Sequence, residues 1–285
     1  MNADPLGRIT VVVATRDRRG DLERSLAHHE APVIVVDNGS SDGTVEAVRR
    51  WSGADVVALG VNRGATARNV GVARARTPYV AFADDDSWWA PGALARAADV
   101  LDAHPRLGLL AALVLVGASE EPDPVCAQMA SAPLGTCADL PGPSVLGFLA
   151  CGAVVRRSAF LAAGGFDEVV FFYGEEERLA LDLAAAGWGL AYVDSVTAIH
   201  RPSPARDPDA RRALATRNSV LTACLRRPWR VVGRRVLGAA RGGPVARAGL
   251  AAAVPRLPRA LAARRRLPRH VEAARRLLDH SWPAG

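Results

Sequence analysis

The stretch YVAFADDDSWW, residues 79–89, joins a short apolar run directly to three consecutive carboxylates. Tyr79–Ala83 predicts a strand of the kind found in a sheet that is buried on both faces. Asp84–Asp86 would repel one another strongly unless a divalent cation and hydrogen-bond donors shared the site. Oxygen ligands suit Mg²⁺ or Mn²⁺, which bridge to the phosphates of a bound molecule. The alternative is a solvated acidic turn in front of a helix from Pro91 to about His104.

Strands and helices alternate upstream of this stretch with short connections, which indicates right-handed βαβ units and a mostly parallel sheet. The expected strands are residues 8–15, 33–36, 54–59 and 79–83, and the expected helices are residues 21–29, 44–51 and 65–75. Polar residues stand at the carboxyl ends of three strands: Thr15 with Arg16, Asp37, and Asp84–Asp86. Ligands of such sheets bind outside these ends, so the sequence predicts one site where they meet.

The second half of the chain has a less regular pattern. We expect strands over residues 107–116, 148–155 and 188–193, and a loop over the site from the Pro-, Gly- and Ser-rich residues 118–147. Glu175–Glu177 begin a helix that ends near Ala186, and acids in a first turn are favoured by the helix dipole. His200 follows the last strand by a few residues. Beyond Pro208 the pattern is helical and is interrupted by prolines.

Composition sets broad limits on the class of protein. A chain of 285 residues with 49% hydrophobic residues fits one large or two small domains with a sizeable core. No apolar run reaches the roughly 18 residues that a membrane span requires. The N-terminal MNADPLGR has no signal pattern, so we expect a cytoplasmic protein. The four cysteines show no CxxC or zinc spacing, which favours free thiols.

The positive charge is concentrated near the C-terminus. Every one of the 36 basic residues is arginine, and residues 226–285, the C-terminal extension, hold 15 of them against 2 acidic residues. The extension is consistent with a helical cap that docks on the acidic remainder of the chain. It is also consistent with peripheral contact to an anionic membrane at its inner surface. Few aromatic residues interleave the arginines, which argues against nucleic acid as a partner.

Seven motifs occur in one order: VVVATRDR, VDNGSSDGT, NRGATARNVG, the three aspartates, CGA, GGFDE followed by YGEEE, and His200. Together they resemble the inverting family-2 glycosyltransferases with the GT-A fold, over residues 8–225. The resemblance implies an α/β GT-A fold, which is Rossmann-like, with a mixed, mostly parallel sheet flanked by helices. It divides residues 1–225 into a nucleotide-sugar half (about 8–105) and an acceptor half (about 106–225). The Arg-rich helical extension follows from the pattern beyond Pro208 instead.

The resemblance implies a nucleotide-diphosphate sugar as donor, with uridine as the expected base. Asp37 matches the residue that binds the base, although a turn-forming Asp is the structural alternative. Thr15 and Arg16 match the loop over the base and diphosphate. Arg68 matches an arginine that faces the nucleotide, where a guanidinium binds a diphosphate with two parallel donors. Its alternative role is a solvated helix face, and Arg63 or Arg74 are the rivals for the contact.

The same resemblance assigns the acidic cluster and His200. Asp84 matches the residue that contacts the ribose, and Asp86 matches the ligand of the divalent metal, Mn²⁺ or Mg²⁺. Asp85 stands between them and is grouped with the nucleotide-binding residues, with a side chain turned into the fold as the alternative. His200 matches a third metal ligand, for which its imidazole must be neutral.

The resemblance places the catalytic base in Glu175–Glu177. Glu176 aligns with the base, which would accept a proton from the acceptor hydroxyl as that oxygen attacks the sugar. The family commonly has Asp at the position of Glu176. Glu175 is therefore kept as the second choice for the base. Gly152, Phe172 and Tyr173 are the expected acceptor contacts. The acceptor itself stays open between a glycan, a lipid-linked molecule and a small natural product.

Two other functions compete with a hexosyl-transferring enzyme. A nucleotidyltransferase acting on sugar phosphates would carry a glycine-rich basic loop after the first strand, whereas ATRDRRGD has one glycine. A non-catalytic sugar-binding protein would not need the aspartates, the glutamates and His200 together. Both alternatives are therefore disfavoured.

Overall fold

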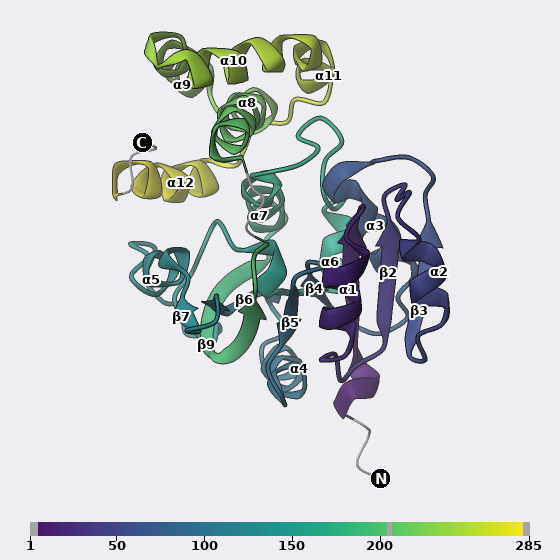
Figure 1. Ribbon diagram of the computed structural model, residues 1–285. Coiled ribbons are helices and arrows are strands. Elements are labelled where there is room, and N and C mark those ends of the chain that lie inside the picture. The colour runs from purple at the N-terminus through teal and green to yellow at the C-terminus, as the bar shows by residue number, and fades with distance from the viewer. Residues whose placement is uncertain (1–4, 204–206, 282–285) are drawn as a thin grey trace.

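The computed structural model describes residues 5–203 and 207–281, and its first half alternates strands and helices (Figure 1). Residues 1–4, part of the segment that we searched for a signal, lie outside the described residues. The elements are η1 (Pro5–Arg8), β1 (Ile9–Thr15), α1 (Arg19–Leu26), β2 (Val33–Asp37), α2 (Thr44–Arg49), β3 (Ala54–Ala58), η2 (Gly64–Thr66), α3 (Ala67–Arg74), β4 (Tyr79–Ala83), β5 (Ser87–Trp89) and α4 (Ala93–Ala103). The predicted alternation is confirmed, and among the strands and α-helices named here β5 alone was not expected.

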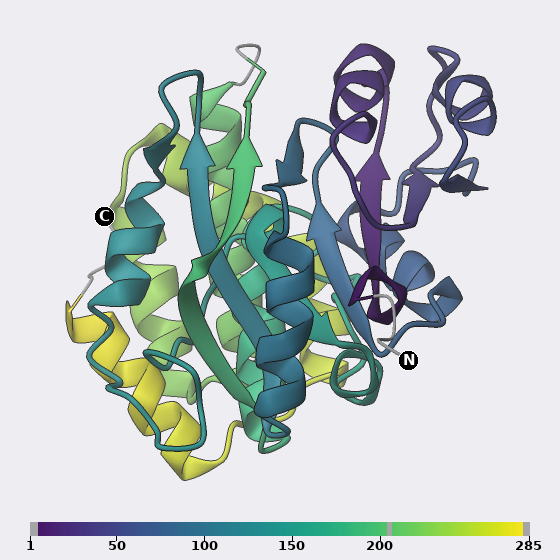
Figure 2. The same cartoon turned by 90° about the horizontal axis from the view of Figure 1, so that it is seen from below.

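The next part of the chain completes the sheet. Its elements are β6 (Leu107–Val116), β7 (Glu121–Pro122), α5 (Pro124–Ala130), η3 (Ala150–Gly152), β8 (Ala153–Arg156), α6 (Arg157–Ala162), α7 (Glu175–Ala185) and β9 (Gly189–His200). The order across the sheet is β3-β2-β1-β4-β8-β6-β9-β5, and β7 pairs with β6. β3, β2, β1 and β4 are parallel neighbours, and β6 and β9 run parallel side by side (Figure 2). The α/β class and the mixed sheet are confirmed.

Apolar strand residues account for the buried sheet. All five residues of both β2 and β4 are buried, and the first six residues of β6 are buried as well. α7 lies on one side of the sheet and α4 on the other, so the central strands are covered on both faces (Figure 1). Burial of both faces is the reason that these strands read as continuous apolar runs.

Three expectations for the second half were wrong. The strand expected over residues 148–155 is shorter, because Ala150–Gly152 form η3 and β8 covers only Ala153–Arg156. Residues 118–147 do not form one continuous loop, because β7 and α5 interrupt them. After α5 they return along β9, where Ser144 bridges to Ala191 and the Val145 N–H donates to the Leu190 carbonyl. The last strand is also longer than expected, because β9 passes through an irregularity opposite Ala112 and Leu113 and ends at His200 itself.

The C-terminal helices stack on α7 and beside it (Figure 1). They are α8 (Pro208–Arg226), α9 (Trp229–Arg241), α10 (Pro244–Ala253), η4 (Val254–Arg256), α11 (Leu257–Ala262) and α12 (Arg269–Ser281). Arg227 is fully buried here, and its guanidinium lies 2.6 Å from Glu272 and 2.7 Å from Asp279. The expected helical extension is confirmed within the described residues. None of the helices that the structure describes combines the length and the apolar character needed to cross a bilayer.

Candidate active site

The carboxyl ends of β1 and β2 place Thr15 beside Asp37. Asp37 is 2% exposed, and its Oδ2 accepts the backbone N–H groups of Gly39 and Ser40, each at 3.1 Å. Its Oδ1 is buried and has no hydrogen-bond partner among the described residues. A buried carboxylate oxygen without a donor is costly. Asp37 therefore suits a ligand that brings an N–H or O–H group to this edge of the sheet.

The three aspartates have three different partners. Asp84 forms an ion pair with Arg68 of α3. Asp85 accepts a hydrogen bond from the Thr15 hydroxyl at 3.0 Å, and Oδ1 of Asp86 lies 3.2 Å from Nε2 of His200. Burial, together with the charges of its two neighbours, raises the pKa of Asp85 to about 7. A proton on Asp85 over part of the neutral range relieves the repulsion that the sequence implies.

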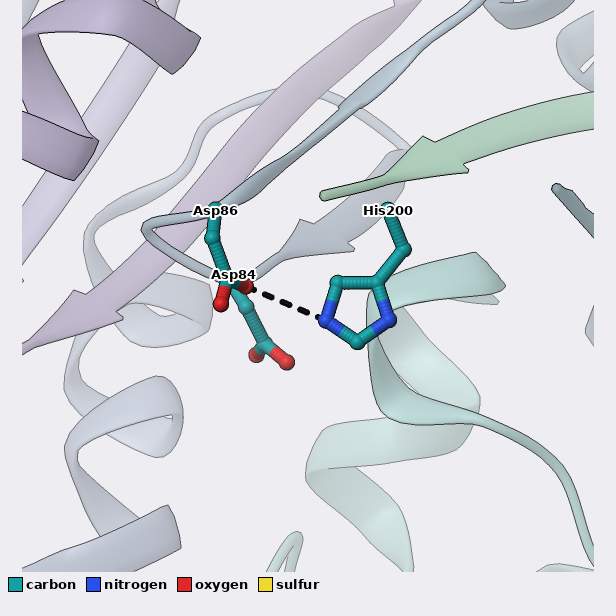
Figure 3. A group of neighbouring side chains, drawn as sticks. All are labelled: Asp84, Asp86 and His200. Carbon is teal, nitrogen blue, oxygen red and sulfur yellow. Dashed lines mark ion pairs between the residues drawn. The ribbon is translucent and has the colours of Figure 1, made fainter. Parts of the chain in front are cut away.

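Asp84, Asp86 and His200 form a cluster that fits a divalent cation. One ligand atom from each lies within 4.8 Å of the others. The two carboxylates and the imidazole face one another in Figure 3. Carboxylate oxygens suit Mg²⁺ and Mn²⁺, and an added imidazole nitrogen favours the softer Mn²⁺. The chemistry of the donor set therefore matches the ion expected from the sequence.

This cluster is assembled by the pairing of β5 with β9. The antiparallel register sets Ser87 opposite His200, and the backbone N–H of Arg201 donates to the Asp86 carbonyl at 2.8 Å. Asp86 directly precedes Ser87, so the pairing fixes the carboxylate next to the imidazole. A strand of three residues has no stability of its own and persists here because β9 supplies its hydrogen bonds.

Arg68 connects the aspartates to α7. Its side chain is buried, pairs with Asp84, and places Nη1 3.6 Å from Oε1 of Glu175. Gly71, on the same helix, allows α3 to approach β1 closely, because a Cβ at this position would lie 2.4 Å from Cγ1 of Val12. The buried Nε of Arg68 has no hydrogen-bond partner among the described residues. The described residues therefore leave one donor of this buried guanidinium unsatisfied.

The three glutamates at the start of α7 differ in their surroundings. Glu175 is buried, and burial raises its pKa in spite of the nearby Arg68 charge. Glu176 is partly exposed, and desolvation followed by the charge of Glu175 raises its pKa to about 8. Glu177 is desolvated too, but Arg235 and Arg275 lower its pKa to about 2. Glu176 is thus the accessible carboxylate whose pKa suits it to accept a proton near neutral pH.

An aromatic loop, residues 171–173, precedes α7. Phe171 and Tyr173 have φ angles of 72° and 70°, in the left-handed region that bulky residues rarely adopt. Asn218 of α8 holds the loop, since its Nδ2 donates to the carbonyls of Phe172 at 2.7 Å and Tyr173 at 2.6 Å. The Phe172 side chain is 41% exposed. The loop therefore presents an aromatic ring to solvent directly before the glutamates.

Two other residues expected in the site are Arg16 and Gly152. Arg16 is half-exposed, with its Nε 3.5 Å from Oδ2 of Asp17. Gly152 is buried against Val114, whose Cγ2 would lie 2.4 Å from a Cβ at position 152. Close packing accounts for a glycine there. The nucleotide contact of Arg16 and the acceptor contact of Gly152 stay predictions.

Sequence reasoning did not find the residues that hold α7 from outside. Arg235 of α9 and Arg275 of α12 contact the same oxygen of Glu177, at 3.2 and 2.9 Å. Asn218 was missed as well. Each lies more than 40 residues from its partner in the sequence. The charge contrast between the two parts of the chain was the one signal available, and it indicates docking without naming the pairs.

The family model described as "Glycosyl transferase family 2" matches residues 10–162, more than half of the chain. The chain belongs to glycosyl transferase family 2. This match confirms the resemblance seen in the motifs and contains the three aspartates, Asp37 and Arg68. It stops before α7 and His200, so the match does not bear on the glutamates of α7 or on His200.

One curated relative and two solved structures are similar to this glycosyltransferase. It is 32% identical over 246 residues to an N-acetylglucosaminyl-diphospho-decaprenol L-rhamnosyltransferase of Mycobacterium tuberculosis, covering 70% of this chain and 78% of that protein. The mannosyltransferase PcManGT from Pyrobaculum calidifontis, in complex with GDP-Man and Mn²⁺, has a TM-score of 0.62 at 21% identity, covering 98% and 88%. TarS of S. aureus with UDP-GlcNAc has a TM-score of 0.60 at 17% identity, covering 94% and 83%. The two structures support the GT-A fold.

The pairing of Glu177 makes the stability of this glycosyltransferase depend on pH. Its pKa is about 2 in the folded chain against 4.5 ordinarily. The contribution, about 3 kcal/mol by linkage, is fully present above pH 4.5 and is lost as the pH falls through 2. We expect Glu177→Gln to lower the free energy of unfolding by this order at pH 7, and the deficit to shrink as the pH falls below 4.5. Urea denaturation across this range measures it.

The matched control is Glu46→Gln, on the exposed side of α2. Its stability should follow the wild type at every pH. A Glu177→Gln deficit that stays constant from pH 7 to pH 3 would mean that the ion pairs are not its cause.

Proposed function

We propose that the protein is an inverting, metal-assisted glycosyltransferase that moves a sugar from a nucleoside diphosphate, UDP first among the candidates, to an acceptor hydroxyl. The observation that carries the proposal is the chain of contacts from the Asp84–Asp86–His200 cluster through Arg68 to Glu175, next to Glu176. The candidate cation site is thus connected through Arg68 to the start of α7, where the candidate base Glu176 lies. We also propose that residues 8–105 bind the donor and residues 106–225 the acceptor.

The donor side uses the unsatisfied groups described above. Oδ1 of Asp37 would accept the ring N–H of a uracil, thymine or guanine base. Asp84 would meet the ribose, and Arg68 would donate to the diphosphate. Asp86 and His200, with Asp84, would hold Mn²⁺ or Mg²⁺, which supplies charge neutralisation for the diphosphate leaving group.

The acceptor side centres on α7. Glu176 would accept the proton of the attacking hydroxyl, and attack from the face opposite the diphosphate would invert the configuration at the sugar carbon. Partial desolvation and the charge of Glu175 keep the pKa of Glu176 high enough for this transfer. The exposed ring of Phe172 and the neighbouring Tyr173 would cover one side of the acceptor sugar.

We propose a lipid-linked diphosphate glycan as the acceptor class. The support is the relative that is 32% identical and is named for a decaprenol-linked diphosphate acceptor and L-rhamnose. Transfer of L-rhamnose is accordingly the first activity to assay. Product formed with an acceptor that bears a polyprenyl diphosphate, and none with the free sugar, would support this class.

Thermal shift with nucleoside diphosphates tests the donor site without an acceptor. We expect UDP or TDP with Mn²⁺ to raise the melting temperature more than ADP or CDP, because a ligand that binds only the folded chain stabilises it by mass action. Asp86→Ala should remove the dependence on Mn²⁺. Asp194→Ala, at an exposed position of β9, serves as the matched control. No shift with any nucleotide would refute the proposal.

Asp37→Ala provides a separate test of base recognition. Loss of a buried charged acceptor is expected to weaken UDP binding by about 1.5–3 kcal/mol, roughly 10- to 100-fold. The Mn²⁺ dependence should survive, because Asp37 lies outside the metal cluster. Titration calorimetry measures both. Equal affinity of Asp37→Ala and wild type for UDP would remove Asp37 from the site.

A further inference from the structure

The C-terminal extension contains a hollow of about 450 Å³ that the transferase proposal does not use. It lies between the start of α9, the connection before α12, and α12 itself. Its charged lining consists of Arg226, Arg230, Arg266, Arg269, Arg276 and Glu272. Five guanidinium groups therefore surround one space with a single carboxylate among them.

Two of these arginines are neutralised by the fold. Arg226 binds Asp182 of α7, with Nη2 2.9 Å from Oδ2. Arg276 lies 3.0 Å from Glu272, and that carboxylate is already shared with the buried Arg227. The single acid of the hollow is thus fully occupied by two arginines.

The other three arginines, Arg230, Arg266 and Arg269, are exposed. None forms an ion pair with any acid in residues 5–203 or 207–281. Docking of the extension explains Arg227, Arg235 and Arg275 but leaves these three cations unexplained. Like charges that converge without a partner favour an anion between them.

Apolar side chains lie next to the hollow. Trp229, beside Arg230, is 60% exposed, and the Arg264 guanidinium lies 4.1 Å from its ring centroid. Leu277 is 53% exposed and is one turn beyond Ala273, which lines the hollow. Exposed tryptophan and leucine beside arginines are typical of surfaces that lie in the membrane interface. A soluble phosphate would leave these apolar groups in water.

We propose that this hollow binds the phosphate of an anionic phospholipid and holds the protein on a membrane surface. The three arginines contact the head group, and Trp229 and Leu277 enter the boundary between head groups and acyl chains. Arg226 and Arg276 remain in their internal pairs and shape the wall. The proposal is independent of the transfer reaction.

Sedimentation with lipid vesicles tests it on the full chain without donor or acceptor. Wild type should sediment with phosphatidylcholine vesicles that contain phosphatidylglycerol and not with phosphatidylcholine alone, and salt should weaken the binding. The Arg230→Gln/Arg266→Gln/Arg269→Gln variant should partition about 100-fold less, since each arginine near an anionic surface contributes roughly fivefold, or about 1 kcal/mol.

The control variant removes the same number of positive charges from a region outside the C-terminal extension. Arg49→Gln/Arg50→Gln/Arg76→Gln changes three exposed arginines in and near α2 and α3, and it should bind vesicles much more strongly than the first variant. Equal losses in the two variants would mean a general charge effect and overturn the site. Glycerol phosphate or a short RNA that binds the wild type as tightly as the vesicles do would overturn the membrane assignment. Because no transfer is measured, failure here leaves the transferase proposal intact.

Discussion

Glu176→Gln is expected to lower kcat by about 10²- to 10⁴-fold, the usual contribution of a general base. The amide keeps the size of the side chain but cannot accept the proton of the acceptor hydroxyl. Glu176→Asp should retain part of the activity. Binding of UDP with Mn²⁺ should be largely retained in both variants, because the metal cluster consists of Asp84, Asp86 and His200 and does not include Glu176. Single-turnover transfer and titration calorimetry separate these effects.

The pH dependence of kcat/KM tests the role of Glu176 as base independently, because a residue with a purely structural role would not produce a limb at its own pKa. The base must be ionised, and the pKa of Glu176 is raised to about 8. We expect kcat/KM of the wild type to rise with pH up to about 8 and then level off. Added Mn²⁺ should move this limb to lower pH, since a nearby cation favours the carboxylate.

Glu175→Gln is the discriminating comparison. Glu175 is buried and paired with Arg68, so its loss should weaken positioning. The pH limb should persist but move to lower pH, because the charge of Glu175 contributes to the raised pKa of Glu176. If the limb disappears in Glu175→Gln and persists in Glu176→Gln, the base is Glu175.

The second large effect concerns the buried ion pair of the extension. Glu272→Gln leaves Arg227, which is fully buried, with Asp279 as its remaining carboxylate. Removal of one partner from a buried pair typically costs about 3–5 kcal/mol. We therefore expect this loss in the free energy of unfolding by urea at pH 7, with loss of cooperativity if α12 separates first.

Asp55→Asn is the matched acid-to-amide control, because Asp55 and its partner Arg74 are both at least half-exposed. A surface pair of this kind contributes about 0–1 kcal/mol. A Glu272→Gln variant as stable as Asp55→Asn would show that burial of Arg227 does not depend on the pair.

Local pattern was sufficient for much of the fold. The bounds expected for the strands at residues 79–83 and 107–116 are those observed. Both strands are buried on both faces, and burial demands an unbroken apolar run that is legible from the residues alone. The same reasoning placed Thr15, Asp37 and the aspartates at one edge of the sheet, because parallel strands end together.

The sequence by itself determined the strand–helix alternation, the edge of the sheet where polar residues gather, and the basic character of the extension. Only the tertiary structure decided that β5 exists, that β9 reaches His200, and that Glu177 binds Arg235 and Arg275. The physical reason is the same for each. A three-residue strand, a strand continued past an irregularity and a buried ion pair gain their stability from partners far along the chain, so no local pattern carries them.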